Sequence, residues 1–409
     1  MDKRTYDIWN DDDGAEEEGR KKSRRLRRFL IFLLVLVVVL GIVALAAWRD
    51  GTGFDALRRY FSYGSAESSS GSETYRYDAS SANRFALLDD TLVVLSDTSL
   101  RLVSQGGEEV WSTSIRMSTP ALESAGNWAV AYDVGGTQIL VVNRDGQVLQ
   151  METGENDLII SVSLSEDGYL AVTAEKKNYK GCVSVYDLSG ELLFAFNSSQ
   201  RFVVDACSFD GGQRLAAVTL GQENSVFVSN VVLYNLKETG GQASSDGTGV
   251  EIPSYADYDI TNGLILEIAE REGTLLSVTD TSLDQTDAQG ENQWSYSYQG
   301  EYLREYDLGG DSFTALLLNR YRSGSVGRLV TVGEDGAELA SLDVNEEVVG
   351  ISAAGRYLAV LYTDELVIYT PELETYATLV GTGAAVDVIQ REDGSALLLS
   401  ADSAQVFLP

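Results

Sequence analysis

Short apolar segments in which hydrophobic and polar positions alternate follow one another from Glu73 to the end of the chain. Turn residues separate them, and no stretch of about 10–15 residues has helical periodicity, so this region is predicted to be all-β. A turn residue followed by an apolar strand recurs at Asp90, Gly126, Gly168, Gly212, Gly273, Gly310, Gly355 and Gly394.

The spacing of these anchors predicts a β-propeller. The intervals are 36, 42, 44, 61, 37, 45 and 39 residues, and the longest contains a polar insertion, residues 237–254, that we expect to be one loop. Without the insertion the period is about 42 residues, which is typical of propeller blades. About 330 residues divided among eight anchors gives about 41 per blade. We therefore predict eight four-stranded blades, with seven as the alternative.

The ends of this region are predicted to close the ring. The last unit, residues 384–409, has room for only three strands, whereas each earlier unit has room for four. The extended segment 74–78 (TYRYD) precedes the first full unit and is predicted to supply the missing outer strand. Such closure removes the exposed sheet edge.

A second repeated element places an aromatic residue four positions after a glycine. It reads Gly107-EEVW, Gly190-ELLF and Gly290-ENQW, with weaker copies at Gly146 and Gly336. We interpret it as the turn before the outer strand of each blade, with Trp111, Phe194 and Trp294 packing into the gap between blades. Stacking of a ligand on these rings is the alternative.

An uninterrupted apolar segment precedes the β region. Residues 29–48 contain no charge over 20 positions, enough to cross a bilayer core of about 30 Å. Seven cations occupy the nine positions 20–28, and few follow the segment, so the positive-inside rule places the N-terminus in the cytoplasm. The alternative is a cleaved signal peptide, since Ala44-Leu45-Ala46 has a small-x-small form.

These patterns divide the chain into four parts. Residues 1–28 form a cytoplasmic tail, and residues 29–48 form a single transmembrane helix. Residues 49–72 combine a short interfacial helix, with Phe54, Leu57 and Phe61 at helical spacing, and a Ser/Gly-rich linker. Residues 73–409 form the extracytoplasmic propeller.

Composition excludes several classes of function. The chain has 62 acidic and 30 basic residues and a net charge of -32, which disfavours binding to nucleic acid. It contains no histidine, so Ser-His-Asp and Cys-His catalysis and His-ligated metals are excluded. The sequence singles out no catalytic residue, no cofactor-binding residue and no metal ligand.

The two cysteines, Cys182 and Cys207, fall in neighbouring units within apolar surroundings. Two cysteines in 409 residues do not form a disulfide framework, so we expect buried free thiols. A bridge between two blades is the alternative.

The scarce cations of the exterior part gather in two loops. Six of its 21 basic residues lie in AEKKNYKG and NRYRSGSVGR, each predicted to join the second and third strands of a unit. Equivalent connections project from the same face of a propeller, so the loops predict a shared rim that contacts an anionic partner. Solvated loops are the alternative. The candidate rim residues are Lys176, Lys177, Tyr179, Lys180, Arg320, Tyr321, Arg322 and Arg328.

The Gly-x-x-x-Trp turns resemble those of PQQ-like (quinoprotein-type) propellers. The TYDIWN start, the basic run, the apolar segment, GTGFDALRRYFSYG and the terminal SALLLS…FLP resemble a family of membrane-anchored bacterial propellers of unknown function. The resemblance implies a Gram-positive cell surface and brings no known activity. A quinoprotein dehydrogenase needs calcium and, in many members, adjacent cysteines, which Cys182 and Cys207 are not. We therefore expect no cofactor.

Together these observations predict a non-catalytic binding or scaffolding module, anchored in the cell membrane with its propeller outside the cytoplasm. The expected partner is an envelope protein or an anionic wall polymer. A cell-surface enzyme acting on a glycan or small molecule, and a transmembrane sensor, are the alternatives.

Overall fold

The computed structural model describes residue 38 and residues 69–409, apart from 224, 237–252 and 261–262. The chain divides into two compact units, residues 1–66 and 67–409. Of the predicted transmembrane segment only Val38 is described, and the predicted interfacial helix lies outside the described residues. Among the residues that are described, no helix has the length and apolar character needed to span a bilayer.

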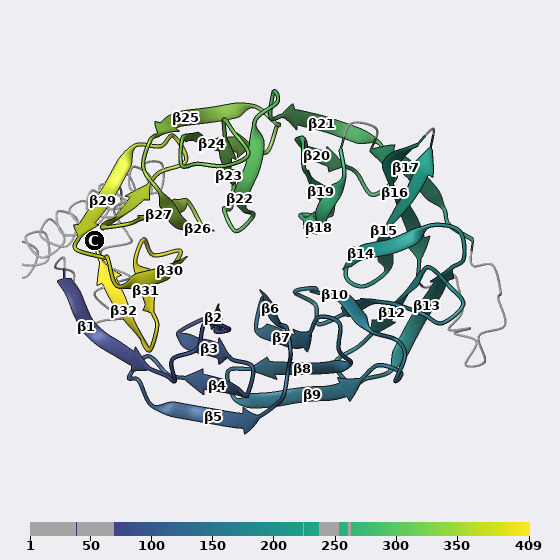
Figure 1. The fold of residues 1–409 in the computed structure, drawn as a ribbon, viewed down its shortest axis with the longest axis horizontal. Helices are drawn as coiled ribbons and strands as arrows, with labels where there is room; N and C mark the ends of the chain where they lie inside the picture. Colours follow the sequence, from purple (N-terminus) through teal and green to yellow (C-terminus); the bar gives the residue numbers. More distant parts are fainter. Residues whose placement is uncertain (1–37, 39–68, 224, 237–252, 261–262) are drawn as a thin grey trace, which may run out of the picture. The chain divides into compact units, whose positions relative to one another are not determined.

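The second unit is a ring of eight four-stranded antiparallel blades, which confirms the predicted propeller and excludes seven blades (Figure 1). In blades one to seven the strands run in chain order from the axis outward, and we call them the inner, second, third and outer strands. In blade eight the last three strands of the chain are the first three, and the first strand of the unit is the outer strand.

The first four blades follow one another in sequence. Blade one contains β2 (Arg84–Leu88), β3 (Thr91–Leu95), β4 (Ser99–Val103) and β5 (Glu109–Ser114). Blade two contains β6 (Pro120–Ala125), β7 (Trp128–Asp133), β8 (Gln138–Asn143) and β9 (Gly146–Glu152). Blade three contains β10 (Ile159–Leu164), β11 (Leu170–Ala174), β12 (Gly181–Tyr186) and β13 (Leu192–Ser198). Blade four contains β14 (Phe202–Phe209), β15 (Arg214–Glu223), β16 (Val226–Asn235) and β17 (Ala256–Ile260), so the polar insertion joins its third and outer strands.

The remaining blades complete the ring. Blade five contains β18 (Ile265–Arg271), β19 (Thr274–Thr279), β20 (Ser282–Thr286) and β21 (Asn292–Ser297). Blade six contains β22 (Tyr302–Asp307), β23 (Phe313–Asn319), β24 (Gly327–Gly333) and β25 (Glu338–Val344). Blade seven contains β26 (Val348–Ala354), β27 (Tyr357–Tyr362), β28 (Glu365–Tyr369) and β29 (Thr375–Val380). Blade eight contains β30 (Ala385–Gln390), β31 (Ala396–Ser400), β32 (Ser403–Leu408) and, as its outer strand, β1 (Ser69–Arg76).

The closure of the ring follows the sequence prediction, with a longer strand than expected. The outer strand begins at Ser69 rather than at residue 74, inside the segment predicted to be a linker. It pairs with β32 from Ser69 opposite Leu408 to Arg76 opposite Ser403. Beyond it, the Tyr77 hydroxyl lies 2.8 and 2.7 Å from the carbonyl oxygens of Ser400 and Ser403. The first strand of the ring therefore completes its last blade.

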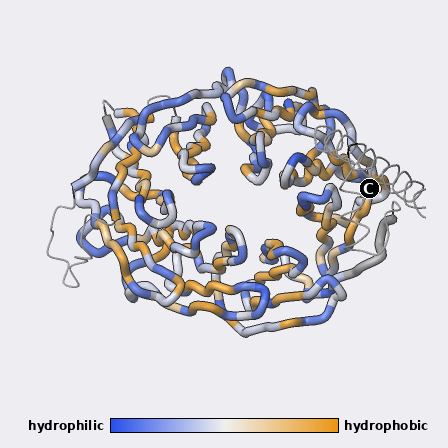
Figure 2. Tube along the Cα trace, turned by 180° about the vertical axis from the view of Figure 1, so that it is seen from behind, coloured by the Kyte–Doolittle hydropathy of each residue, from blue (hydrophilic) through white to orange (hydrophobic). Residues whose placement is uncertain are grey.

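The hydrophobic core lies between neighbouring blades. The second strands are almost wholly buried, and β3 and β7 are examples in which nearly every residue is inaccessible. The cluster around Leu95 and Ala129 joins blades one and two, and the cluster around Val183 and Leu215 joins blades three and four. Figure 2 shows hydrophobic segments within the blades, and the chain nearest the axis mixes hydrophilic and hydrophobic residues.

The predicted packing of aromatic residues between blades is confirmed. Trp111, on the outer strand of blade one, lies against Gly146 of blade two, where an added Cβ would be 3.1 Å from the ring. Trp294 of blade five lies against Gly336 of blade six, where that distance would be 2.6 Å. The Trp294 Nε1–H also donates to the Glu334 carbonyl over 2.7 Å. Phe194 is buried and packs against Tyr234 of blade four, with centroids 5.4 Å apart.

Both cysteines are buried and free, as predicted. Cys182 lies on β12, and Cys207 lies on β14 of the next blade. Burial raises the pKa of the Cys182 thiol to about 11 and that of Cys207 well above its ordinary value. Both are therefore protonated at neutral pH and weak nucleophiles.

Candidate binding face and axial carboxylates

The two cationic loops lie on the same face of the ring, as their sequence positions predict. One joins β11 to β12 in blade three, and the other joins β23 to β24 in blade six. Because the strands of each blade are antiparallel and in the same order, all connections between second and third strands leave at one face. We call this the loop face and the opposite one the turn face. Three steps around the ring separate the two loops, so they form two clusters rather than one patch.

In the blade-three loop, two of the three lysines face solvent. Lys176 is half-buried and forms an ion pair with Asp157 of the preceding connection, and this hydrogen bond raises the pKa of Lys176. Lys177 and Lys180 are exposed, and the Lys180 ammonium lies 4.8 Å from the ring centroid of Phe202. Phe202, at the start of β14, is 52% exposed, so this pair of side chains presents a cation beside an aromatic surface.

The blade-six loop repeats this arrangement. Arg328 forms ion pairs with Glu301 at 3.0 Å and Glu338 at 3.2 Å, which neutralise it. Arg320, Tyr321 and Arg322 are exposed. The Arg322 guanidinium lies 5.6 Å from the ring centroid of Tyr302, which begins β22.

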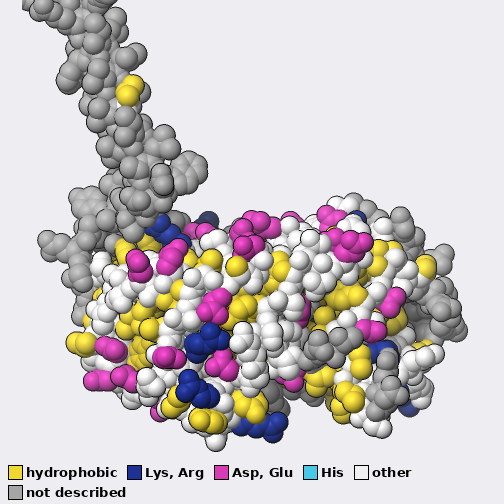
Figure 3. All heavy atoms as spheres, turned by 90° about the horizontal axis from the view of Figure 1, so that it is seen from above, with side chains coloured by type: hydrophobic (Ala, Val, Ile, Leu, Met, Phe, Trp, Pro, Cys, Tyr) yellow, Lys and Arg dark blue, Asp and Glu magenta, His cyan; other side chains and the backbone are white. Residues whose placement is uncertain are grey.

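The structure thus sorts the eight predicted rim residues. Lys176 and Arg328 are held in ion pairs, and Tyr179 is half-buried within its loop. The residues that remain available to a partner are Lys177, Lys180, Arg320, Tyr321 and Arg322. Along the lower edge in the side view of Figure 3, Lys and Arg side chains lie beside hydrophobic ones.

Sequence reasoning missed an apolar element of the same face. β15 and β16 are each ten residues long, and their pairing continues to Glu223 opposite Val226. Val226 and Phe227 near this tip are 63% and 57% exposed. The signal in the sequence was the run of Val-Phe-Val directly after a polar turn.

Sequence reasoning also missed a set of carboxylates around the axis. In blades three to eight the pairing of the inner with the second strand shifts register by one residue near the start of the inner strand. The residue after this β-bulge occupies an equivalent position in each of these blades. It is an acid in four of them, namely Asp205, Glu267, Glu305 and Asp387. For Asp205 and Asp387 the signal was a lone acid inside a mostly apolar strand, whereas Glu267 and Glu305 lie in strands with other charged residues.

Two of these carboxylates join adjacent blades. The Asp205 Oδ1 accepts a hydrogen bond from the Ser161 hydroxyl of blade three over 2.9 Å, and its Oδ2 accepts one from the Ile268 N–H of blade five over 3.1 Å. The Glu305 Oε1 accepts one from the Ile351 N–H of blade seven, also over 3.1 Å. These acids therefore satisfy inner-strand backbone donors that have no sheet partner.

The surroundings of several inner-strand carboxyl groups raise their pKa values. Desolvation within the ring raises the pKa of Glu123 to about 8 although its side chain is exposed to solvent, and the carboxylates of Asp205 and Glu267 raise it further. The Tyr132 hydroxyl donates to Glu123 over 3.2 Å, and this hydrogen bond lowers the pKa of Glu123. Burial likewise raises the pKa of Asp205 and of Asp307 to about 6.

The axial acids do not form a metal centre. Among the residues that the structure describes, no three Cys, Asp or Glu side chains converge to hold an ion. Carboxyl groups with pKa values of 6–8 can exchange protons at neutral pH, and this is the chemistry that the axis offers.

The eight four-stranded antiparallel sheets define this protein as an all-β, eight-bladed propeller. The chain belongs to a family of unknown function, DUF5711, whose model matches residues 59–372. A search of curated proteins finds no match.

Solved structures show the same fold at low sequence identity. The C-terminal WD40 domain of Sif2 is 15% identical with a TM-score of 0.58, and the match covers 83% of this chain and 98% of that one. BamB from Moraxella catarrhalis is 11% identical with a TM-score of 0.51, covering 83% and 99%. A eukaryotic initiation factor is 9% identical with a TM-score of 0.51, covering 82% and 93%. Identities this low establish the fold and nothing more.

The raised pKa of Glu123 predicts that stability falls as the pH rises. Between its ordinary pKa of 4.5 and about 8, the folded chain keeps a proton that the unfolded chain has released, so raising the pH favours unfolding. Unfolding by urea should give a free energy that decreases from pH 5 to pH 8.5. Glu123→Gln should remove most of the decrease in the free energy of unfolding above pH 6. The decrease below pH 6 should remain, because it comes from Asp205 and Asp307.

The matched control is Glu372→Gln, which changes an exposed acid on the outside of the ring. It should leave the pH dependence as in the wild type. An unchanged decrease between pH 6 and pH 8.5 in Glu123→Gln would contradict the assignment.

Proposed function

We propose that this protein is a membrane-anchored, non-catalytic propeller that serves as a binding module at the bacterial cell surface, with its loop face directed at an anionic wall polymer. The observation that carries the proposal is the group of exposed cations on the loop face, Lys177, Lys180, Arg320 and Arg322. They stand out in a chain whose net charge is -32.

The form of the two clusters supports an anionic partner. In each, one cation lies over an aromatic ring that is itself partly exposed, Phe202 in one and Tyr302 in the other. A phosphate or carboxylate group can pair with the cation while an apolar part of the polymer covers the ring. The chain as a whole is strongly acidic, which disfavours unspecific contact with polyanions away from these clusters.

The position of the chain entry supports a tethered arrangement. β1 begins at Ser69, opposite Leu408 at the end of a third strand, and third strands end at the turn face. The chain therefore enters the ring at the turn face, and the loop face lies on the opposite side of the ring.

Thiol labelling tests the proposed topology. The two native cysteines are buried, so wild-type protein should react little with a membrane-impermeant maleimide. Ser323→Cys, in the exposed blade-six loop, should be labelled in intact cells. Ser23→Cys, before the apolar segment, should be labelled only after permeabilisation. Labelling of Ser323→Cys that also requires permeabilisation would place the propeller in the cytoplasm and overturn the proposal.

Charge reversal tests the binding face. Full-length protein in detergent should bind immobilised poly(glycerol phosphate), and Lys177→Glu or Arg322→Glu should each raise the Kd about tenfold, because each loses a charge-assisted contact. Arg144→Glu is the matched control, since Arg144 lies in the β8–β9 turn on the turn face and is 63% exposed.

The control variant makes the same change in net charge and should alter the Kd less than twofold. Equal weakening by all three variants would mean that binding is unspecific. The absence of binding by the wild-type protein would show that the partner is not a polymer of this kind.

A further inference from the structure

A pocket of about 770 Å³ opens where the ring closes, between blades eight and one. Its walls come from the start of β2, the start of β30, the turn after β31 and the connection from β1 to β2, all at the loop face, with Leu122 of β6 in blade two. The residues that line it are Ala79, Ser80, Ser81, Asn83, Arg84, Phe85, Leu122, Val386, Asp387, Ser400 and Ala401.

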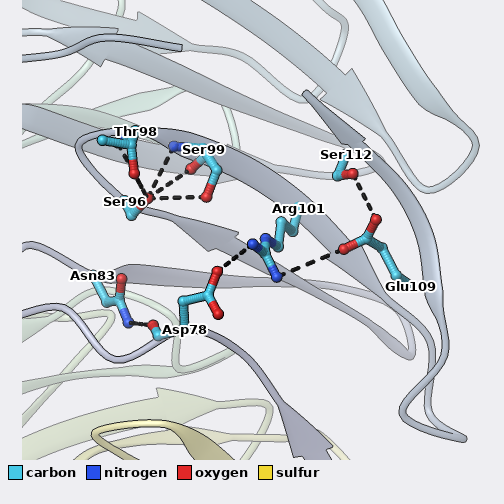
Figure 4. A network of polar contacts seen from close by, with 8 residues as sticks. All are labelled: Asp78, Asn83, Ser96, Thr98, Ser99, Arg101, Glu109 and Ser112. Atoms are coloured by element: carbon cyan, nitrogen blue, oxygen red, sulfur yellow. Dashed lines mark hydrogen bonds and ion pairs between the residues drawn. The ribbon is translucent and has the colours of Figure 1, made fainter. Parts of the chain in front are cut away.

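The connection that forms one wall is held in shape by polar contacts (Figure 4). Asp78 forms an ion pair with Arg101 on β4, and Arg101 also contacts Glu109 on β5. The Asn83 Nδ2–H donates to the Asp78 carbonyl over 3.0 Å, and the Ala82 N–H donates to the Ser80 hydroxyl over 3.1 Å. Hydrogen bonds and an ion pair therefore fix the shape of this wall of the pocket.

One polar atom in this wall lacks a partner. The amide nitrogen of Asn83 is engaged with Asp78, whereas its Oδ1 is buried and accepts no hydrogen bond from the described residues. A buried carbonyl without a donor costs free energy, so this atom is an internal cost of the closure and not a ligand contact.

Opposite charges stand on the two blades that meet here. Arg84 is exposed at the start of β2, with one guanidinium N–H donating to the Asn83 carbonyl over 3.0 Å and the others available. Asp387 on β30 accepts the Val388 N–H at its Oδ1, which leaves its Oδ2 available. Arg84 lowers the pKa of Asp387, which burial raises, yet the two side chains do not form an ion pair with each other. The site thus offers a separated cation and anion.

We propose that this pocket binds a short peptide with free termini. The peptide carboxylate pairs with Arg84, and its ammonium group pairs with Asp387. Its apolar side chains lie against Phe85, Leu122 and Val386. The volume lies within the usual range of ligand pockets and exceeds what a single amino acid needs.

Other ligand classes fit this pocket less well. A polyphosphate would require several cations, and Arg84 is the one cation that lines the pocket. A metal ion would require converging acids, and Asp387 is the one acid there. The inference goes beyond the proposed function, because Lys177 and Arg322 do not line the pocket.

Calorimetry on full-length protein in detergent tests the proposal with three probes, namely Leu-Leu-Leu, its N-acetyl form and its C-terminal amide. The free tripeptide should bind, and blocking either end should raise the Kd about tenfold, the loss of one charge-assisted contact. Arg84→Gln should bind the free tripeptide and its C-terminal amide with the same Kd. Asp387→Asn keeps an acceptor for the Val388 N–H. It should bind the free tripeptide and its N-acetyl form with the same Kd.

The wild-type protein alone makes the proposal falsifiable. If no probe binds at millimolar concentration, or if all three bind equally, the pocket does not hold a zwitterionic peptide. Lys177→Glu should leave tripeptide binding unchanged, so failure of the polymer proposal and failure of this one are distinguishable. A variant that keeps its preference for free termini after loss of Arg84 or Asp387 would also overturn the assignment.

Discussion

The contact between an outer-strand aromatic ring and the turn of the next blade is the interaction on which the ring depends. An added Cβ would clash with Trp294 at Gly336 and would crowd Trp111 at Gly146. Both glycines have positive φ values, +133° and +75°, a conformation that other residues adopt at a cost. The contact therefore fixes both the turn and the distance between neighbouring blades.

A second seam near the axis uses polar contacts instead. Asp205 and Glu305, on inner strands, accept backbone N–H groups of the following blades. The contacts that join the blades lie at the outer strands and near the axis. They do not involve the exposed side chains of the loop face. A rigid ring can thus carry variable chemistry on its loops, as on Lys180 beside Phe202 and in the pocket beside Arg84.

Features that repeat could be predicted from the sequence, because the same local pattern of strand and turn residues recurs in each blade. The strand periodicity, the glycine turns, the ring closure and the buried cysteines were all readable in this way. Features that depend on distant partners were not. The ion pair of Arg328 with Glu301 joins residues 27 positions apart. The axial position of Asp387 follows from a bulge, and the pocket exists only because blades eight and one meet there.

The most direct test of this account compares two glycines by urea unfolding. Gly300 has a φ of +87° and no atom within 4 Å of an added Cβ, so Gly300→Ala reports the backbone cost alone, about 1 kcal/mol. Gly336→Ala should cost more, because its methyl group would meet Trp294. In a Trp294→Ala background the excess should vanish, a coupling of roughly 0.5–3 kcal/mol. Equal costs at the two glycines, or an excess at Gly336 that persists without Trp294, would contradict the claim that this contact spaces the blades.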